Sequence, residues 1–302
     1  MARFVRIARA VATNQLARFA PSAYVRLTGQ TGRGAAAEEG ASDIARYFRG
    51  CVADYFAKLG VEQSEVERFL AGKVLMEYGP GDLPGVAALM VSGGAEKVYC
   101  VDRFPLVNLS EKNSQVMRDL VATTAGAARD RLLSCLNSSD DARAGFDPRR
   151  IDYVVKPSGL SQLRELVDLV ISRAVLEHVN DLDATFDDMV AAMRPGALAI
   201  HLVDLRSHGL HRSNLLDFLE WSPTLWHWMY SEKGVPNRWR MDKYRAIVER
   251  LPVDLIALEP THYAPLADVA AVRPHLAPAF RHVGDADLAC LGFWLVFRKR
   301  VG

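Results

Sequence analysis

Residues 73–82 read Lys73-Val74-Leu75-Met76-Glu77-Tyr78-Gly79-Pro80-Gly81-Asp82, an apolar run that ends in an acid and a glycine-rich turn. A small-residue segment, 85–90, follows at once. This order predicts a buried strand, a tight turn and a helix, because glycine permits a sharp turn and lets a ligand approach the backbone. A second apolar run, 97–101, ends in Asp102 about 20 residues past the turn, where a carboxylate can accept hydrogen bonds from a ribose diol. The stretch predicts a nucleotide-binding α/β fold.

The acid at the end of the first strand helps to decide which nucleotide binds. A dinucleotide turn reads Gly-x-Gly-x-x-Gly/Ala and places a pyrophosphate at a helix N-terminus. Here Pro84 stands at the third glycine position, and the carboxylate of Glu77 would repel a pyrophosphate but suits a ligand that carries an ammonium and a sulfonium. The pattern Glu77-x-Gly79-x-Gly81, followed by Asp102, resembles motif I and the ribose acid of the class I S-adenosylmethionine-dependent methyltransferases. A structural turn in an unrelated α/β protein is the alternative that this motif leaves open.

The rest of the chain alternates between short apolar runs and segments with helical spacing. Strands are expected over 73–78, 97–102, 151–155, 167–172 and 197–204, and helices over 42–70, 84–92, 111–123, 127–136, 160–166 and 181–193. Such alternation predicts a parallel, doubly wound sheet.

Three further blocks strengthen the resemblance. Residues 168–179 read Asp-Leu-Val-Ile-Ser-Arg-Ala-Val-Leu-Glu-His-Val, and 193–196 read Met-Arg-Pro-Gly. Together they are similar to the strand-four and strand-five region of small-molecule methyltransferases of the methyltransferase-11 type. Residues 287–297 are similar to the last strand of that fold. The resemblance, which covers about residues 70–205, implies a Rossmann-like, doubly wound seven-stranded sheet whose last strand is antiparallel, with additional N-terminal helices.

The resemblance also implies S-adenosylmethionine as the cofactor. Its methionine end would lie near Glu77 and Gly79, its ribose at Asp102 and its adenine near 157–159. The cofactor-binding residues implied in this way are Glu77, Tyr78, Gly79, Pro80, Gly81, Asp102, Arg103, Ser158 and Arg173. Arg173 has two other interpretations, recognition of an acidic acceptor or pairing with Glu177, and we expect the pairing.

The acceptor chemistry directs attention to histidines. Methyl transfer is an in-line displacement in which the protein mainly positions the partners, but an oxygen or nitrogen acceptor must also lose a proton. We predict His208 as the general base, with Asp204 supporting it, and His178 as its rival. Positioning without a histidine base is the remaining alternative. His201 is expected to pack within the sheet.

No metal is expected. The metal-dependent catechol type of methyltransferase places carboxylates at the end of strand four, where this chain has Ser172 and Arg173.

Composition restricts partners and compartment. The chain has 302 residues and a net charge of +1, so it offers no general basic field for nucleic acid, and it lacks an Asn-Pro-Pro-Tyr motif. Its four cysteines are scattered without a CxxC pair, which argues against a zinc ribbon and fits a reducing cytoplasm. No apolar run reaches the roughly 18 residues of a spanning helix, so no integral membrane segment is expected. We predict a cytoplasmic protein.

The N-terminal segment differs from the rest. Residues 1–37 hold six arginines and no acidic residue. A docking helix followed by a Gly/Ala linker over 29–40 is expected, while a transit peptide, or a helix that contacts a membrane surface through residues 1–20, are the alternatives. The predicted domains are 1–41, a basic helix and linker, and 42–302, the methyltransferase domain. Within it, the Trp- and His-rich segment 206–250 is a helical cap after strand five, interpreted as an acceptor pocket or as an ordinary cap with an aromatic core.

The predicted function is S-adenosylmethionine-dependent methyl transfer to an oxygen or nitrogen of a small-molecule acceptor, such as a sugar, a lipid precursor or a secondary metabolite. Two alternatives remain, a non-catalytic nucleotide-fold protein that binds a partner and an NAD-dependent oxidoreductase. The sequence does not predict an oligomeric state.

Overall fold

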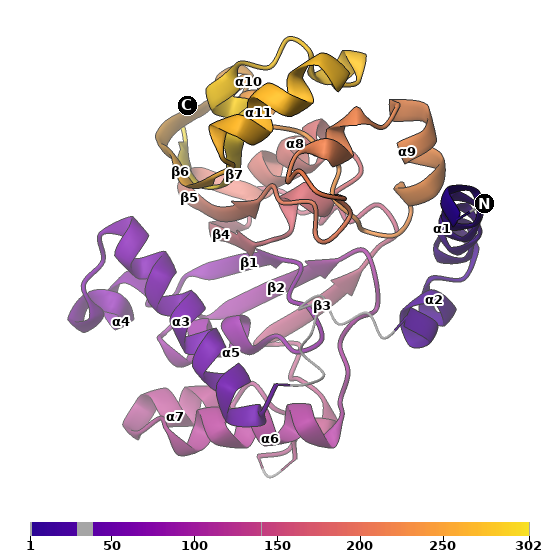
Figure 1. Cartoon of the computed structure of the whole chain (residues 1–302). Coiled ribbons are helices and arrows are strands. Elements are labelled where there is room, and N and C mark those ends of the chain that lie inside the picture. The colour runs from indigo at the N-terminus through magenta and orange to yellow at the C-terminus, as the bar shows by residue number, and fades with distance from the viewer. Residues whose placement is uncertain (1, 29–38, 140, 302) are drawn as a thin grey trace. The chain divides into compact units, whose positions relative to one another are not determined.

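The computed structural model describes residues 2–28, 39–139 and 141–301 (Figure 1). Its strands form a seven-stranded sheet with the order β3-β2-β1-β4-β5-β7-β6, and β7 runs antiparallel to both of its neighbours. The strands are β1 (Val74–Tyr78), β2 (Lys97–Asp102), β3 (Ile151–Val155), β4 (Val167–Arg173), β5 (Met193–Asp204), β6 (Val253–Tyr263) and β7 (Cys290–Lys299). The prediction of a doubly wound seven-stranded sheet with an antiparallel last strand is confirmed.

The chain divides into two compact units, which are described separately. One comprises 29–171 and 191–197, and the other comprises 1–28, 172–190 and 198–302. The first contains α3 (Ala41–Leu59), α4 (Val66–Leu70), α5 (Gly85–Ser92), α6 (Glu111–Ala122) and α7 (Gly126–Leu133). The second contains α1 (Ala2–Phe19), α2 (Pro21–Thr28), α9 (Pro223–Tyr230), α10 (Met241–Arg250), α11 (Leu266–Val272), α12 (Asp285–Ala289) and most of α8 (Leu182–Ala192).

Parallel pairing aligns the ends of β1 and β2 in the first unit. Tyr78 is in register with Val101, so the turn after β1 and the acid at the end of β2 lie at one edge of the sheet. Helix α5 is buried on all sides, as expected of a helix without a polar face. Its first residue, Gly85, allows α3 to pack closely, because an added Cβ would overlap the ring of Phe48.

Two expected helices differ in this unit. The helix expected over 42–70 is broken at Gly60, whose left-handed backbone (φ 68°) ends α3. The helix expected over 160–166 is absent, and the prediction was wrong. The N–H groups of Glu165 and Leu166 donate to the carbonyls of Ala191 and Ala192, both at 2.8 Å, so this segment pairs with another part of the chain instead of coiling on itself.

Strand β5 begins earlier than the predicted 197–204. It begins at Met193 and includes the Arg-Pro-Gly segment, which lies before the predicted start of the strand. Arg194 donates to both carboxylate oxygens of Asp168 on β4, at 2.9 and 2.8 Å. This side-chain pairing explains how the start of the segment is held in extended backbone, before Gly196 takes a positive φ of 80°.

The second unit has two apolar centres. The buried rings of Phe186, Tyr244 and Phe297 pack with centroids 6.0 and 6.3 Å apart. A separate cluster gathers around Leu216, Phe218 and Phe280, where α9, α11 and α12 meet the chain between them. The segment 206–250 is partly helical, as expected, since α9 and α10 both lie in it.

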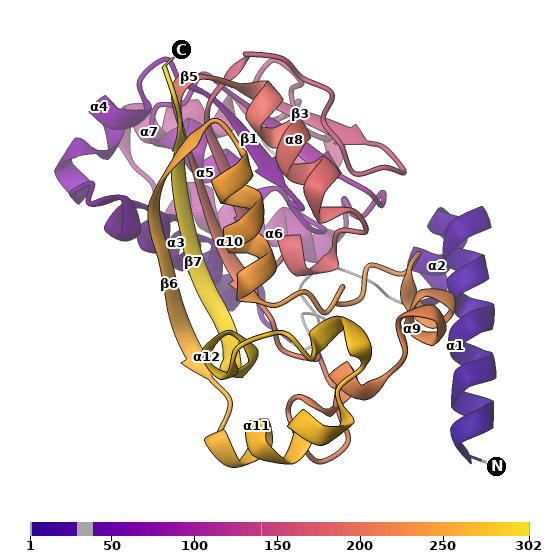
Figure 2. The ribbon, with the colours of Figure 1, turned by 90° about the horizontal axis from the view of Figure 1, so that it is seen from above.

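The basic N-terminal segment forms α1, which lies alongside α9 (Figures 1 and 2). Asn14 is 1% exposed, donates to the carbonyl of Trp228 at 3.1 Å and accepts the N–H of Glu232 at 2.8 Å. Lys233 Nζ donates to the carbonyl of Ala10 at 2.9 Å. A docking helix is therefore present. The linker expected over 29–40 falls mostly outside the described residues, and the 1–41 and 42–302 domain boundary stays a prediction.

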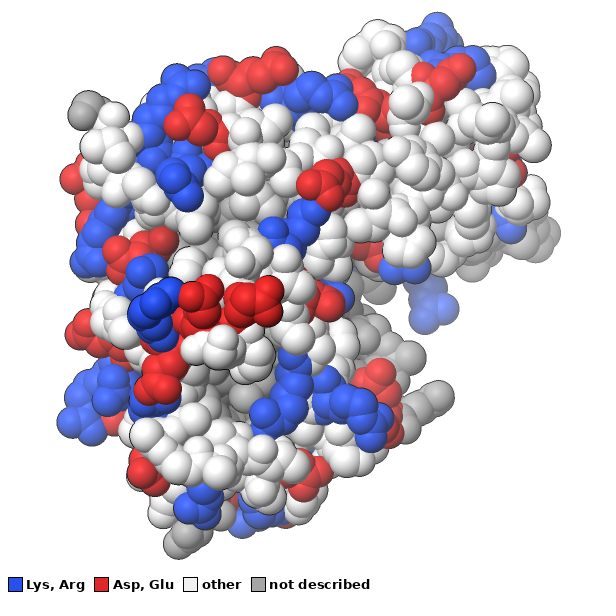
Figure 3. Space-filling model, turned by 90° about the vertical axis from the view of Figure 1, so that its left-hand side faces the viewer, with Lys and Arg blue, Asp and Glu red and all other residues white. Residues whose placement is uncertain are grey.

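The surface adds little that is specific. Within the described residues, none of the helices combines the length and the apolar character needed to cross a membrane. On the face shown in Figure 3, basic and acidic side chains are interspersed, so neither sign dominates it.

Candidate functional site

The turn after β1 depends on its two glycines. Gly79 and Gly81 have φ values of 66° and 73°, a conformation that side chains other than glycine rarely adopt. The N–H of Gly79 donates to the carbonyl of Val101 at 2.8 Å, which fastens the turn to the end of β2. Asn113 Nδ2 donates to the carbonyl of Asp82 at 3.2 Å, which fastens its far side to α6. The turn is held from both ends, and Tyr78 and Pro80 complete it.

Glu77 is buried at the end of β1 and is only 7% exposed. Burial raises the pKa of Glu77 to about 8, with a further contribution from Asp102, although the amide of Ala87 in the first turn of α5 and the thiol of Cys100 favour the charged form. A carboxyl group in this state is mostly protonated at neutral pH. A cationic ligand would stabilise its charged form, so the site suits a positively charged group.

Asp102, at the end of β2, has one oxygen engaged and one unpaired. Its Oδ1 accepts the N–H of Phe104 at 3.0 Å. Its Oδ2 is buried and has no hydrogen-bond partner among the described residues. Burial raises the pKa of Asp102 to about 6. Because an unpaired buried oxygen is costly, a ligand hydroxyl at this position would be stabilising. Glu77, the glycine turn and Asp102 therefore fit a cationic nucleoside.

The neighbouring loops bear on the adenine prediction. An added Cβ on Gly159 would lie 3.7 Å from Cβ of Arg103, so the loops after β2 and β3 are neighbours. Ser158 Oγ accepts the N–H of Leu160 at 3.3 Å and so helps to form its own turn. The assignment of Arg103 and Ser158 to cofactor binding stays a prediction.

At the end of β4, in the second unit, Glu177 is buried without a hydrogen-bond partner. It is 1% exposed, neither of its oxygens has such a partner among the described residues, and burial raises its pKa well above the usual range. Neither oxygen accepts a hydrogen bond from Arg173, and the expected pairing of Arg173 with Glu177 stays a prediction. Arg173 has other interactions, and its role at the cofactor stays a prediction.

The two candidate histidines contact each other. The ring of His178 lies edge-on to that of His208, with centroids 4.9 Å apart. Burial, with a smaller contribution from the nearby His208, lowers the pKa of His178 to about 4, so this imidazole is neutral at pH 7. The backbone of His208 has a φ of 51°, an uncommon left-handed conformation that often marks functional sites.

The support expected from Asp204 goes to another residue. Arg206 Nε donates to both oxygens of Asp204, at 2.8 and 3.0 Å. His208 Nε2 lies 3.9 Å from Asp204 Oδ2, close enough for electrostatic attraction but too far for a hydrogen bond. His201 is fully buried in the sheet, as expected, and its Nδ1 lies 2.7 Å from Ser172 Oγ.

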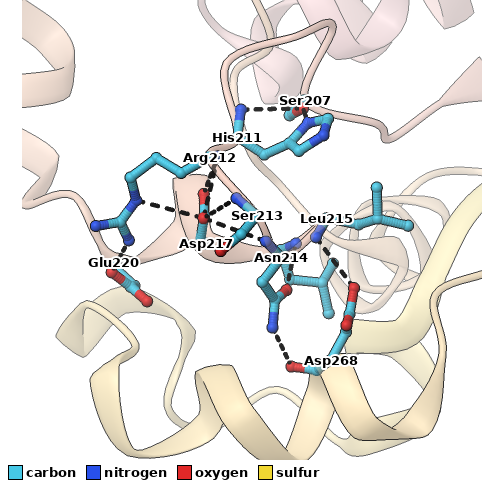
Figure 4. A network of polar contacts seen from close by, with 10 residues as sticks. Ser207, His211, Arg212, Ser213, Asn214, Leu215, Asp217, Glu220 and Asp268 are labelled. Carbon is cyan, nitrogen blue, oxygen red and sulfur yellow. Dashed lines mark hydrogen bonds and ion pairs between the residues drawn. The ribbon is translucent and has the colours of Figure 1, made fainter.

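The loop that carries His208 is held by a polar network (Figure 4). The carboxylate of Asp217 accepts the N–H groups of Arg212 and Ser213, at 3.1 and 3.2 Å, and Ser207 bonds to the ring of His211. A cavity of about 240 Å³ opens beside this loop. It is lined by Asp204, Arg206, Ser207, His208, Gly209, His211, Leu215 and Leu291. His208 therefore has room for a small ligand next to it.

A family model described as a methyltransferase domain matches residues 52–251, about two thirds of the chain. The chain belongs to this family. It is a class I S-adenosylmethionine-dependent methyltransferase, as the sequence predicted. No curated protein sequence matches the chain.

Several solved structures resemble the methyltransferase. An S-adenosylmethionine-dependent methyltransferase from Mesorhizobium loti shares 15% identity over 76% of this chain and 92% of its own, with a TM-score of 0.41. Phosphoethanolamine N-methyltransferase 2 of Haemonchus contortus, in complex with S-adenosyl-L-methionine, shares 14% identity over 79% of this chain and 52% of its own. Its TM-score is 0.41. A putative sarcosine dimethylglycine methyltransferase from Galdieria sulphuraria shares 14% identity over 84% of this chain and 86% of its own, with a TM-score of 0.42.

The methyltransferase also has a group of side chains that could hold a metal ion. Ligand atoms of Glu177, His178 and His208 all lie within 4.8 Å of one another. One carboxylate and two imidazoles are a donor set that divalent transition metals accept. The prediction of no metal rested on Ser172 and Arg173 and did not consider this group, so it stays a prediction.

Sequence reasoning missed two residues that shape the donor site. The hydroxyl of Tyr153, on β3, donates to the carbonyl of Phe104 at 2.9 Å and accepts the N–H of Leu106 at 3.0 Å, so it orders the loop after Asp102. Asn113 holds the glycine turn. The N-cap Ser110, three residues before Asn113, signalled the start of α6 but not the contact with the turn.

Proposed function

We propose that this methyltransferase transfers the methyl group of S-adenosylmethionine to an oxygen or nitrogen of a small-molecule acceptor. The observation that carries the donor side is the pair Glu77 and Asp102, at the ends of adjacent strands, with a buried oxygen of Asp102 unpaired. Glu77 binds the ammonium of the methionine portion, and Asp102 accepts hydrogen bonds from the ribose. Gly79 and Gly81 keep the backbone between them open to the cofactor.

On the donor side, the chain's own contribution to the reaction is binding and orientation. When bound, S-adenosylmethionine supplies an electrophilic methyl group. Glu77 becomes charged as it receives the ammonium, and Asp102 exchanges an unpaired buried oxygen for a charge-assisted hydrogen bond. Fixing the donor in this way removes part of the entropic barrier to an in-line displacement.

We assign proton removal from the acceptor to His208. It is exposed, faces the 240 Å³ cavity and contacts the neutral ring of His178, while Arg206 occupies Asp204. His208→Ala should lower turnover by about 10²–10⁴-fold with cofactor affinity nearly unchanged. His262→Ala, at an exposed histidine outside this cavity, is the matched control. Wild-type turnover in both His208→Ala and His178→Ala would show that positioning suffices.

Calorimetry with S-adenosylmethionine, S-adenosylhomocysteine and NAD tests the donor site. Binding of both adenosyl ligands and no NAD binding is expected, and the reverse pattern would favour the oxidoreductase. Asp102→Ala should lose roughly 1.5–3 kcal/mol per ribose hydrogen bond. Cofactor binding without turnover on any acceptor, in a screen with labelled donor, would favour the non-catalytic partner-binding protein.

A cytoplasmic location is proposed on the four scattered cysteines, all of which are free.

A further inference from the structure

A second cavity lies in the unit that carries the candidate histidines. It has a volume of about 350 Å³, within the range of small-ligand sites. Aromatic rings dominate its wall, contributed by Trp226, Tyr230, Trp239 and Phe280. Its charged lining comprises Arg238 and Glu232, while His227 adds an imidazole.

Arg238 is held rigidly in this wall. It is 5% exposed, and its guanidinium lies 4.4 Å from the ring centroid of Trp226 and 5.1 Å from that of Phe280. Nη1 donates to the carbonyls of Phe218 and Trp221, at 3.3 and 2.7 Å. Aromatic contacts on the guanidinium and two bonds at one nitrogen fix the orientation of the whole group.

The other edge of this guanidinium makes no bond. Nε is buried without a partner, and the hydrogen bonds of Arg238 to described residues all come from Nη1. An arginine binds a carboxylate through hydrogen bonds from these outer N–H groups. Because Nε is buried, Nη2, which makes no bond to a described residue, is the group that a ligand in the pocket can reach.

No described carboxylate pairs with Arg238. Burial lowers its pKa to about 9, so it still carries its charge at pH 7. A buried charge without a counterion is expensive, and a ligand anion would offset that cost. The positive φ of Arg238, 74°, is a second local cost that the fold sustains at this residue.

We propose that this pocket binds the carboxylate of an aromatic acid. The Nη2 group can donate to one carboxylate, and the aromatic wall matches a ring. Glu232 in the lining disfavours a second negative charge, so a monoanionic carboxylate is preferred over a phosphate.

The pocket is tied to the histidine pair within the same unit. Asn237, which lines the pocket, donates from its N–H to the carbonyl of Glu177 at 2.6 Å and from Nδ2 to that of Leu176 at 2.9 Å. Val179, also in the lining, directly follows His178. One wall of the pocket is therefore anchored to the backbone of the segment that carries His178.

Three probes of one size test the proposal on the full chain. Benzoate, benzamide and phenyl phosphate are titrated while tryptophan fluorescence and heat are recorded. Benzoate should bind at least roughly tenfold more tightly than benzamide, which lacks the charge. Equal affinities would reduce the site to an apolar pocket, tighter binding of phenyl phosphate would overturn the choice of carboxylate, and no binding of any probe would overturn the site itself.

Two variants locate the binding. Arg238→Lys keeps a positive charge but loses the fixed planar geometry of the guanidinium, and Ala279→Trp fills the pocket without changing Arg238. Each should weaken benzoate binding at least roughly tenfold. Arg245→Lys, at a guanidinium already paired with Asp287, is the control and should leave it unchanged. Unchanged binding in Ala279→Trp would overturn the proposal. Calorimetry with S-adenosylhomocysteine on the same samples reports the donor site independently, so failure of one proposal is distinguishable from failure of the other.

Discussion

Replacing Glu77 by glutamine should stabilise the ligand-free methyltransferase and weaken its binding of S-adenosylmethionine. The pKa of Glu77 is raised from 4.5 to about 8 in the fold. Because the pKa of Glu77 is higher in the folded protein than in the unfolded chain, the folded protein holds this proton more tightly. The resulting stabilisation of the fold is fully present below pH 4.5, the unfolded-state pKa, and is lost as the pH rises toward 8. The wild-type protein therefore loses stability across this range, whereas glutamine resembles the protonated acid and does not titrate.

The magnitude follows from the width of that pH range. The two proteins should be about equally stable near pH 4.5, and the variant should be more stable by roughly 3 kcal/mol at pH 7 and about 5 kcal/mol above pH 8, at 1.36 kcal/mol per pH unit. At roughly 2–4 °C per kcal/mol, thermal unfolding resolves such differences. Glu62→Gln removes an exposed carboxylate and is the matched control, with no such pH-dependent gain expected.

Ligand binding should change in the opposite direction. Loss of the charge-assisted contact with the ammonium weakens S-adenosylmethionine by roughly tenfold or more. In the wild type, binding at pH 7 should release a proton from Glu77, measurable by calorimetry in two buffers of different ionisation enthalpy, and Glu77→Gln should abolish that release while leaving any contribution of Asp102. A variant that is destabilised at pH 8, or that binds with unchanged affinity and proton release, would refute this account of Glu77.

Three further expectations concern other parts of the molecule. Gly81→Val should abolish S-adenosylhomocysteine binding, whereas Gly60→Val, at a similar φ with open space around it, should only destabilise the fold, and calorimetry beside thermal unfolding separates the two. Asn14→Ala should destabilise the docking of α1 by about 1–3 kcal/mol, seen as faster proteolysis between residues 28 and 41. Turnover should persist after treatment with EDTA, and its loss, with recovery on adding zinc or manganese, would overturn the prediction of no metal.

The sequence predicted the sheet well because its signals there are local. β2 and β3 have the predicted bounds, since each is a short apolar run closed by polar or turn residues. The segment 160–166 was mispredicted because its backbone partners, Ala191 and Ala192, lie 26 residues further along the chain. Periodicity reports which face of a segment is apolar, but it cannot report a backbone pairing made with a distant segment.

The residues of the candidate site also differ in whether local sequence signals could place them. The acid at the end of β1 and the acid at the end of β2 could be placed from the sequence, because parallel strands bring their carboxyl ends to one edge. The partner of Asp204 could not be placed, since Arg206 and His208 stand equally within reach in the sequence and only the geometry favours Arg206. Arg238 gave no signal, because the absence of a counterion is a property of its surroundings.

The docking of α1 on α9 has a consequence for synthesis. Asn14 meets Trp228 across 214 residues of chain. At about 5–20 residues per second, the ribosome needs roughly 10–40 s to deliver that partner after the helix has emerged. During that interval the basic helix α1 lacks its partner α9, so Asn14 and Ala17, which are buried in the folded protein, have no surface to pack against. This helix is thus among the last parts of the described chain to reach its final place, because the surface that it covers is synthesised much later.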